Sequence, residues 1–372
     1  MAAILYRIYK GNSRRFARPI LSVNPLLLPA EPLYRRAMRR RRAANLRLRE
    51  RALAPCPIVS VGNLTTGGTG KTPTTQWLAR ALQNRGLRVG VALRGYGGNL
   101  SDGGALVSDG QQTFLGPQVV GDEAALHARN LPGVVVAVAK DRQRATQLAL
   151  QYGAQIVILD DGFQFWSLPR AFDLVLLDAK RPWGNGHLLP VGRLREEKTE
   201  LGRADAVLLT RVERPTLEEL ARTHAEIREL TDAPVFESWH KPLDLRVEKT
   251  GEILPLGVLK GELIKAFAGL ADNGQFYRML RSLGVPFINT PIRERGDHHA
   301  WKRRDFNWTV PDMTVMGALN ERSFKATITT EKDAVKVDAD WFSNPLWSLR
   351  IALQLRDDEA ALEELIWKSL EL

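Results

Sequence analysis

A glycine-rich stretch from Val61 to Pro73, VGNLTTGGTGKTP, constrains the fold more than any other part of the sequence. It follows the apolar run Ile58–Val61 and precedes Thr74–Arg85, whose composition suits a helix. A glycine turn between a strand and a helix directs backbone amides toward an anion. One position departs from the usual P-loop pattern, because Thr65 stands where a first glycine is expected. The stretch predicts a phosphate-binding loop, and the competing interpretation is an ordinary glycine-rich turn.

The loop residues divide the work of binding a nucleotide. Lys71 can reach β- and γ-phosphates, and the hydroxyl of Thr72 is placed for Mg²⁺ at the start of a helix. The segment Thr210–Glu213 lacks the lysine and aspartate with which GTPases read guanine, so ATP is favoured over GTP. The predicted nucleotide-binding residues are Thr65, Thr66, Gly67, Gly68, Thr69, Gly70, Lys71 and Thr72.

The rest of the chain alternates between apolar runs and segments with room for helices, which predicts an α/β fold with a parallel sheet. In such sheets ligands bind beyond the carboxyl ends of the strands. A second alternating block follows a stretch near Pro234–Gly261 that lacks helical periodicity. The runs expected as strands are 58–61, 87–93, 134–138, 155–159, 172–177 and 206–209, then 265–270, 286–289, 326–330 and 349–355 in the second block.

Positive charge is concentrated in the first 55 residues. This arm carries a net charge of +12, so the remainder carries −1 of the chain total of +11. Leu33–Leu53 has helix-compatible composition with nine arginines, while prolines interrupt the apolar segment before it. A spanning helix needs about 20 apolar residues. We therefore expect the arm to lie on an anionic membrane surface, and the alternatives are a solvated basic helix packed on its own domain or a segment that binds nucleic-acid phosphates. A single cysteine, Cys56, excludes a disulfide framework and indicates a reducing compartment.

Four further polar motifs are candidates for the site. Asp160-Asp161 ends an apolar run, and two adjacent carboxylates at that place call for a cation or a basic group. Asp122-Glu123 precedes a probable helix, so Asp122 has an alternative interpretation as a helix N-cap. Gly192–Glu197 could be only a solvated charge run. Asp297-His298-His299 lacks a third ligand at metal-site spacing, so His298 is either an acid/base group or a surface histidine.

Together these segments resemble the tetraacyldisaccharide 4'-kinase (lipid A 4'-kinase) family, and the resemblance covers most of residues 55–340. Eight motifs occur in the family's order. They are VGNLTTGGTGKTP at 61–73, LRGYGG at 93–98, GDE at 121–123, DDGFQ at 160–164, PVGRLRE at 190–196, FAGL at 267–270, DHHAW at 297–301 and TTEKDAVKV at 329–337.

The resemblance implies ATP-dependent phosphorylation of the 4'-hydroxyl of an acylated glucosamine disaccharide 1-phosphate, peripherally at the cytoplasmic face of the bacterial inner membrane. It also implies two α/β/α sandwich domains joined by a small β linker, the first a P-loop NTPase-type parallel sheet. The expected boundaries are 1–55 for the membrane-associating arm, 56–235 for the P-loop kinase domain, 236–262 for the linker and 263–372 for the second domain, with the final segment able to return to the first. No protein partner is expected.

The resemblance also assigns roles to residues. It makes Asp122 the general base for the sugar hydroxyl, with His298 as its partner and Lys71 on the γ-phosphate. Thr72, Asp160 and Glu196 become the Mg²⁺ ligands, directly or through water. Supporting roles around the phosphates and sugar fall to Glu123, Asp161 and Arg195.

The sequence departs from the family pattern at three places. Phe165 stands where His usually follows DDGFQ, Ala124 where Pro usually follows GDE, and Gly269–Asn273 differs from the usual Gly-Ile-Gly-Asn-Pro. None of these removes a proposed catalytic group, but the 269–273 loop bears on the fit of the acceptor.

Two other functions compete with the kinase. A P-loop ATPase switch that regulates membrane or partner binding would share the loop and the acidic strand end, but would not need Asp122 and His298. A nucleic-acid-binding protein rests on the arginines alone, because the body shows no basic stripe interleaved with aromatic residues.

Overall fold

The computed structural model describes residues 25–49, 54–99, 103–269, 273–289, 324–342, 344–356 and 359–371 of the 372-residue chain. The helices are α2 (Ala30–Arg49), α3 (Lys71–Asn84), α4 (Pro117–Val120), α5 (Asp122–Asn130), α6 (Arg142–Gln151), α7 (Leu217–Arg228), α8 (Asn273–Ser282), α10 (Glu331–Ala334) and α11 (Glu359–Ser369). The strands are β1 (Ile58–Asn63), β2 (Val89–Leu93), β3 (Ala105–Ser108), β4 (Val135–Val138), β5 (Ile156–Asp160), β6 (Phe172–Asp178), β7 (Ala206–Thr210), β8 (Val235–Val247), β9 (Ile253–Leu254), β10 (Ile264–Ala266), β11 (Phe287–Asn289), β12 (Thr327–Thr330) and β13 (Leu346–Leu355).

The described strands form one mostly parallel sheet of thirteen strands in the order β11-β10-β12-β13-β8-β7-β6-β1-β5-β2-β4-β3, with β9 on β8. The expectation of an α/β fold with a large parallel sheet is therefore confirmed. Antiparallel pairing occurs between β13 and β8, between β3 and β4, and between β8 and β9. Because β1, β2, β5, β6 and β7 are mutually parallel, the segments that follow them emerge at one edge of the sheet.

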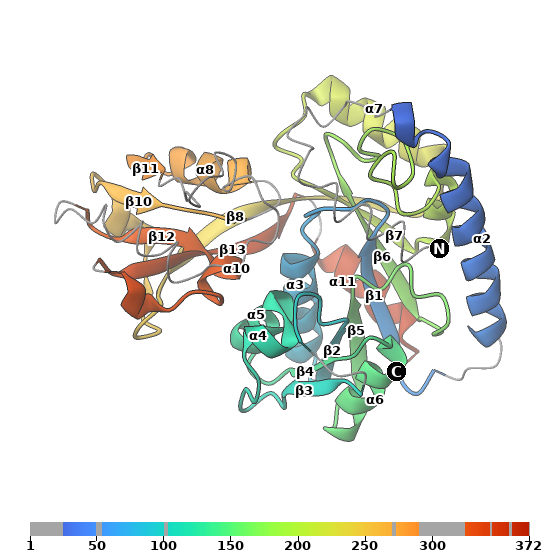
Figure 1. Ribbon diagram of the computed structural model, residues 1–372, viewed down its shortest axis with the longest axis horizontal. Coiled ribbons are helices and arrows are strands. Elements are labelled where there is room, and N and C mark those ends of the chain that lie inside the picture. The colour runs from blue at the N-terminus through green and yellow to red at the C-terminus, as the bar shows by residue number, and fades with distance from the viewer. Residues whose placement is uncertain are drawn as a thin grey trace.

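The molecule has two lobes, and a long antiparallel ribbon runs from one into the other (Figure 1). The P-loop lobe contains β1–β7 with helices α3–α7, and the second lobe contains β10–β12 with α8 and α10. The ribbon consists of β8 and β13, and β8 pairs with β7 through Ser238 before continuing along β13. The sequence did not predict β8 as a full sheet strand, because its residues mix charged and apolar side chains without a clean period. The ribbon belongs to both lobes, so it is the place where they connect.

Alternating side chains on the P-loop lobe's strands face two different cores. Along β5, Ile156 and Ile158 face a core shared with α3, α5 and α11, while Val157 and Leu159 face a core shared with α6. This is the period of two expected of a strand buried on both faces. The C-terminal helix α11 buries Leu362 and Ile366 in the first of these cores, so the chain's last described segment packs on the P-loop lobe.

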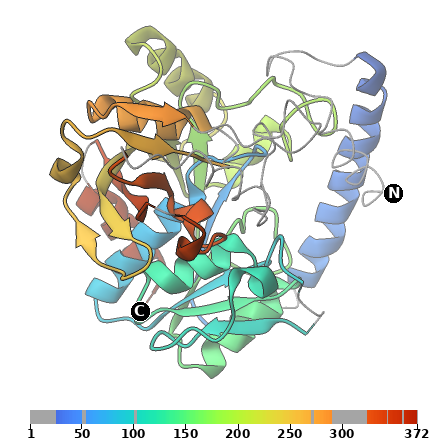
Figure 2. The ribbon, with the colours of Figure 1, turned by 60° about the vertical axis from the view of Figure 1, so that its left-hand side comes forward.

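Helix α2 lies along one side of the P-loop lobe (Figure 2). Tyr34 packs against the core under β6 and β7, and its hydroxyl donates to the carbonyl of Arg195 at 3.0 Å. Arg39 and Arg42 pair with Glu197 and Glu200. No described helix combines the length and the apolar character needed to cross a bilayer. The arm is thus anchored by one tyrosine and several ion pairs beside the segment that follows Arg195.

Close packing at Gly62 gives a test of the fold. A Cβ on Gly62, in β1, would lie 2.4 Å from the Cβ of Phe163 and 2.8 Å from its backbone nitrogen. Because Phe163 is fully buried, the loop of residues 160–164 would have to move. We expect Gly62→Ala to lower the free energy of unfolding by about 1–3 kcal/mol in chemical denaturation. Gly257→Ala is the control, since nothing lies within 4 Å of that Cβ position, and equal stabilities for the two variants would contradict this packing.

Candidate active site

The glycine turn connects β1 to α3 with the geometry of an anion-binding loop. Gly67 and Gly70 adopt left-handed φ angles of 116° and 92°, which side chains other than glycine rarely tolerate. Gly70 occupies the N-cap position of α3, so Lys71 and Thr72 begin the helix. Inside the loop, the amide of Asn63 donates to the hydroxyl of Thr69 at 2.8 Å. The helix start therefore presents unpaired backbone amides and two functional side chains at one point.

A second segment braces this loop. The backbone nitrogen of Thr66 donates to the carbonyl of Arg193 at 2.7 Å, and that of Arg195 donates to Leu64 at 2.8 Å. The PVGRLRE segment thus runs beside the phosphate loop, which explains why Arg195 and Glu196 enter the site. They are not merely a solvated charge run.

Arg211, which follows β7, supports the loop from another side. Its guanidinium donates to the carbonyl of Gly68 at 2.6 Å and pairs with Asp178 at 2.8 Å. Arg211 has a positive φ of 62°, an uncommon conformation for a residue with a side chain. The segment compared with a guanine-reading motif therefore holds the loop in place.

Asp161 is bound to both basic groups of the site. Its carboxylate lies 2.7 Å from Arg195 and 3.5 Å from Lys71. Burial alone would raise the pKa of Asp161, but the charges of Arg195 and Lys71 outweigh burial and hold that pKa well below its usual range. Asp161 also has a φ of 60°, in a region that non-glycine residues enter mainly where the surroundings enforce it. Asp161 is therefore an ionised group that orients Lys71 and Arg195.

Asp160 is buried at the end of β5, where it pairs in register with Val61 of β1. The Nε2 atom of His127, on α5, lies 2.8 Å from one of its oxygens, and His127 is itself fully buried. The sequence analysis did not single out His127. It lies five residues after Asp122 in the helix that GDE begins, and that placement was the available signal.

Asp122 and Glu123 form the start of α5, and they face two lysines of the second lobe. Lys332 lies 3.0 Å from Glu123 and 3.7 Å from Asp122, and Lys336 lies 3.6 Å from Asp122. Lys332 lowers the pKa of Glu123, with help from Lys71 and against the effect of burial. Gly121 holds the N-cap position of α5, so Asp122 is the first helical residue and not its N-cap, and its carboxylate accepts from the backbone nitrogen of Glu123 at 2.9 Å.

The sequence analysis quoted the motif TTEKDAVKV without assigning a role to its lysines. Lys332 lies in α10 and Lys336 in the turn that follows it, and both reach Asp122. Lys336 also pairs with the buried Asp333 at 3.1 Å, and Asp333 accepts from the backbone nitrogen of Gly269 at 2.8 Å. These lysines join the acidic pair of one lobe to the other lobe.

Glu196 is buried, as Asp160 is. Gln164 donates to one of its oxygens and Arg203 pairs with the other, both at 2.7 Å. Burial raises the pKa of Glu196 despite the nearby Arg203 charge. Gln164 also donates to the carbonyl of Asn63 at the end of β1, so Glu196 is connected to the phosphate loop through one amide.

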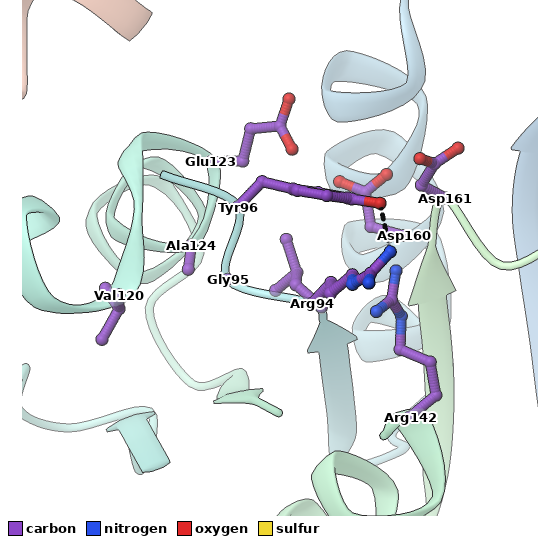
Figure 3. Close-up of a pocket in the computed structure, with 10 residues that line it drawn as sticks. Arg94, Gly95, Tyr96, Val120, Glu123, Ala124, Arg142, Asp160 and Asp161 are labelled. Atoms are coloured by element: carbon purple, nitrogen blue, oxygen red, sulfur yellow. Dashed lines mark hydrogen bonds between the residues drawn. The ribbon is translucent and has the colours of Figure 1, made fainter. Parts of the chain in front are cut away.

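A small hollow lies beside Asp160, Asp161 and Glu123 (Figure 3). Figure 3 shows the carboxylates of Asp160 and Asp161 next to the side chains of Arg94 and Arg142, with Glu123 on the opposite side. Arg94 donates to the hydroxyl of Tyr96 at 2.6 Å and lies over its ring. The hollow is lined by Leu93, Arg94, Gly95, Tyr96, Val120, Glu123, Ala124, Arg142, Asp160 and Asp161. Its lining therefore carries both basic and acidic side chains.

The donors present fit a single magnesium ion held largely by phosphates. The described residues contain no group of three or more His, Cys, Asp or Glu that could hold a metal. Mg²⁺ in phosphoryl-transfer sites commonly takes one or two protein oxygens and completes its shell with water and substrate phosphates. The hydroxyl of Thr72 and the carboxylate of Asp160 supply oxygens of that kind.

The positions where the sequence departs from the family pattern, and His298, are not among the charged groups described above. Phe165 packs against the apolar core beneath α6, so it carries no polar function. Ala124 is buried and lines the hollow. His298 lies outside the described residues, as does the larger part of the 269–273 loop.

The site combines a P-loop that precedes a helix with a neighbouring parallel strand that ends in carboxylates, and basic side chains contact those carboxylates. This combination defines a P-loop nucleotide-binding protein of the kinase type. Comparison with known proteins narrows this class. The model of the tetraacyldisaccharide-1-P 4'-kinase family matches residues 23–371, and the chain belongs to that family.

Named relatives agree with this assignment. The chain is 42% identical over 312 residues to the tetraacyldisaccharide 4'-kinase of Desulfatibacillum aliphaticivorans, covering 81% of this chain and 80% of the relative. It is 37% identical over 356 residues to that of Anaeromyxobacter sp. strain Fw109-5, covering 95% and 93%. Among solved structures it is similar to the "apo" form of LpxK from Aquifex aeolicus in complex with ATP, with a TM-score of 0.70, 32% identity and coverage of 92% and 98%.

Proposed function

We propose that this protein transfers the γ-phosphoryl group of ATP to the 4'-hydroxyl of an acylated glucosamine disaccharide 1-phosphate, a step of lipid A biosynthesis. The observation that carries the proposal is a charged hollow lined by Asp160, Asp161 and Glu123, with Lys71 of the phosphate loop 3.5 Å from Asp161. Family membership supports the identity of the acceptor, since the relatives are tetraacyldisaccharide 4'-kinases.

Some residues of the site would bind the triphosphate, and others would remove the proton of the acceptor hydroxyl. The loop amides from Thr65 to Gly70 and the ammonium of Lys71 hold the triphosphate. Thr72 and Asp160 would hold Mg²⁺, with Glu196 acting through water. Such an ion, when bound, would neutralise negative charge on the phosphates. His127 fixes the orientation of the Asp160 carboxylate, as an outer partner of a ligand does.

In the transfer itself, the 4'-oxygen forms a bond to the γ-phosphorus while the bond from that phosphorus to the β–γ bridging oxygen breaks. ADP leaves with the electron pair of the broken bond, and the hydroxyl proton goes to Asp122. We assign His298 as the partner that orients Asp122. Late proton removal is sufficient in a loose transition state, so the positioning of Asp122 matters more than its basicity.

The basic arm would bring the enzyme to its lipid substrate at the cytoplasmic face of the inner membrane. Arg36, Arg40 and Arg47 are exposed on α2, away from the residues that anchor this helix. Each basic residue near an anionic surface contributes on the order of 1 kcal/mol to binding. The acceptor's acyl chains favour the bilayer, so the enzyme must meet the substrate there.

We expect Arg36→Gln, Arg40→Gln and Arg47→Gln, made together, to weaken binding to vesicles containing anionic lipid by roughly tenfold or more. The apparent KM for the glycolipid should rise while KM for ATP stays the same. The measurement is vesicle co-sedimentation with parallel kinetics. A control that removes three exposed charges elsewhere, at Arg88, Lys241 and Lys260, should bind as the wild type does. Equal losses in both triple variants would contradict a specific role for α2.

An acceptor panel tests the proposed function. The protein is incubated with ATP, Mg²⁺ and either the tetraacylated disaccharide 1-phosphate or its 4'-deoxy analogue. Transfer to the first and none to the second is the expected result. Equal ATP consumption with and without acceptor would instead indicate the ATPase switch, and salt-sensitive retention on DNA through residues 1–55 would indicate a nucleic-acid-binding protein.

A further inference from the structure

His240 lies at the junction between the phosphate loop and the second lobe. It belongs to β8, two residues beyond Ser238, where pairing with β7 ends and pairing with β13 continues. Its side chain is 7% exposed. The ribbon therefore carries a buried polar residue at the point where the chain passes from one lobe to the other.

One edge of the His240 ring contacts the phosphate loop. A Cβ built on Gly70 would lie 2.8 Å from both Cε1 and Nε2 of His240, so the ring occupies the space beside this glycine. Gly70 is the left-handed residue that caps α3 and precedes Lys71. Any change in the position of the His240 ring therefore acts on the turn that places Lys71.

The other edge of the ring contacts the second lobe. The side-chain amide nitrogen of Gln275, on α8, lies 2.9 Å from Nδ1 of His240. Since an amide N–H donates, Nδ1 accepts and the ring proton resides on Nε2. Nε2 has no hydrogen-bond partner among the described residues. Burial, and to a smaller extent the charge of Arg211, lower the pKa of His240 to about 3, so the ring is neutral near pH 7.

We propose that His240 is a positioning residue that couples occupation of the phosphate loop to the placement of the second lobe through Gln275. The contact chain is Gly70 to His240 to Gln275, and it joins three elements that are far apart in sequence. A nucleotide that orders the loop around Gly70 fixes the ring, and the ring fixes the start of α8. By reciprocity, the second lobe affects nucleotide affinity although Gln275 is not part of the phosphate loop.

Two amide variants separate the two contacts. In His240→Asn the side-chain amide reaches the place of Nδ1 and can keep the bond to Gln275, but nothing fills the space beside Gly70. In His240→Gln the amide reaches the place of Nε2 and keeps the contact with Gly70. The readout is the Kd of the non-hydrolysable analogue AMP-PNP with Mg²⁺, measured by calorimetry on the full chain, with the melting temperature measured in parallel.

We expect Gln275→Ala to weaken AMP-PNP binding by about fivefold, the lower end of typical coupling between sites. His240→Asn and His240→Ala should weaken it at least as much, and the double variant His240→Ala/Gln275→Ala should bind no worse than His240→Ala alone. His224→Asn is the matched control. That histidine also bonds to β8, through Glu237 at 2.7 Å, and its replacement should leave the Kd unchanged.

Two outcomes would overturn the proposal. One is Gln275→Ala binding AMP-PNP within twofold of the wild type. The other is losses that multiply in the double variant, which would mean that the two residues act independently. A purely structural role would lower the melting temperature without this pattern in Kd. The coupling rests on the proposed nucleotide site, but because binding is measured without an acceptor, failure of the kinase assay would leave this test readable.

Discussion

Lys71→Ala is expected to lower kcat for transfer to the glycolipid by about 10²–10³-fold, the range seen when one preorganised charge donor is removed from an active site. Lys71 is the first residue of α3 and lies 3.5 Å from Asp161, so its ammonium is held at the phosphate loop before the nucleotide arrives. The fold should survive, because Asp161 keeps its shorter contact with Arg195 and alanine is the best helix former. Single-turnover kinetics at saturating ATP measure the loss.

The control for Lys71→Ala is Lys260→Ala, which removes an exposed lysine from the second lobe. It should leave kcat unchanged. A Lys71→Ala protein that keeps more than a tenth of the wild-type kcat, with an unchanged melting temperature, would contradict the assignment of Lys71 to the transferred phosphate.

Asp122→Asn is expected to lower kcat by about 10²–10⁴-fold, the usual contribution of a positioned general base. Asparagine has nearly the same shape but cannot take the hydroxyl proton. The KM for ATP should change little, because Asp122 lies at the start of α5 and not in the phosphate loop. Asp232→Asn is the charge control, on an exposed residue after α7.

The ion pairs of Asp122 offer a second explanation for a loss of activity in Asp122→Asn, apart from the loss of the general base. Asp122 joins Lys332 and Lys336 of the other lobe, so its replacement also loosens that contact. Lys332→Met and Lys336→Met remove the same ion pairs but leave the carboxylate. If Asp122 is the base, each lysine variant loses much less activity than Asp122→Asn. Losses of equal size would reduce Asp122 to an anchor between the lobes.

The phosphate loop and the strand end after β5 could be predicted because each is encoded locally. Gly67 and Gly70 carry left-handed turns that few other residues adopt, and the apolar run that becomes β5 ends directly in Asp160-Asp161. Parallel pairing of β1 with β5 then brings the two motifs together, as the rule for ligands at the carboxyl ends of strands anticipates.

Contacts between distant segments could not be predicted in the same way. His127 faces Asp160, and Lys332 faces Glu123 across 209 residues of sequence, but neither pairing leaves a periodic or compositional trace. β8 could not be predicted as one long strand. It pairs with β7 at one end and with β13 along the rest, so its apolar and polar side chains do not alternate regularly along its length. The contact between His240 and Gln275 could not be predicted either, because it depends on where that ribbon places His240.

The position of the new phosphate in the product tests the central claim most directly. We predict that phosphorus NMR of the product from ATP, Mg²⁺ and the tetraacylated disaccharide 1-phosphate will show a new phosphomonoester coupled to the proton on the 4' carbon, with one ADP formed for each product. A phosphate attached at any other position, or ADP formed at the same rate without a phosphorylated glycolipid, would contradict the account.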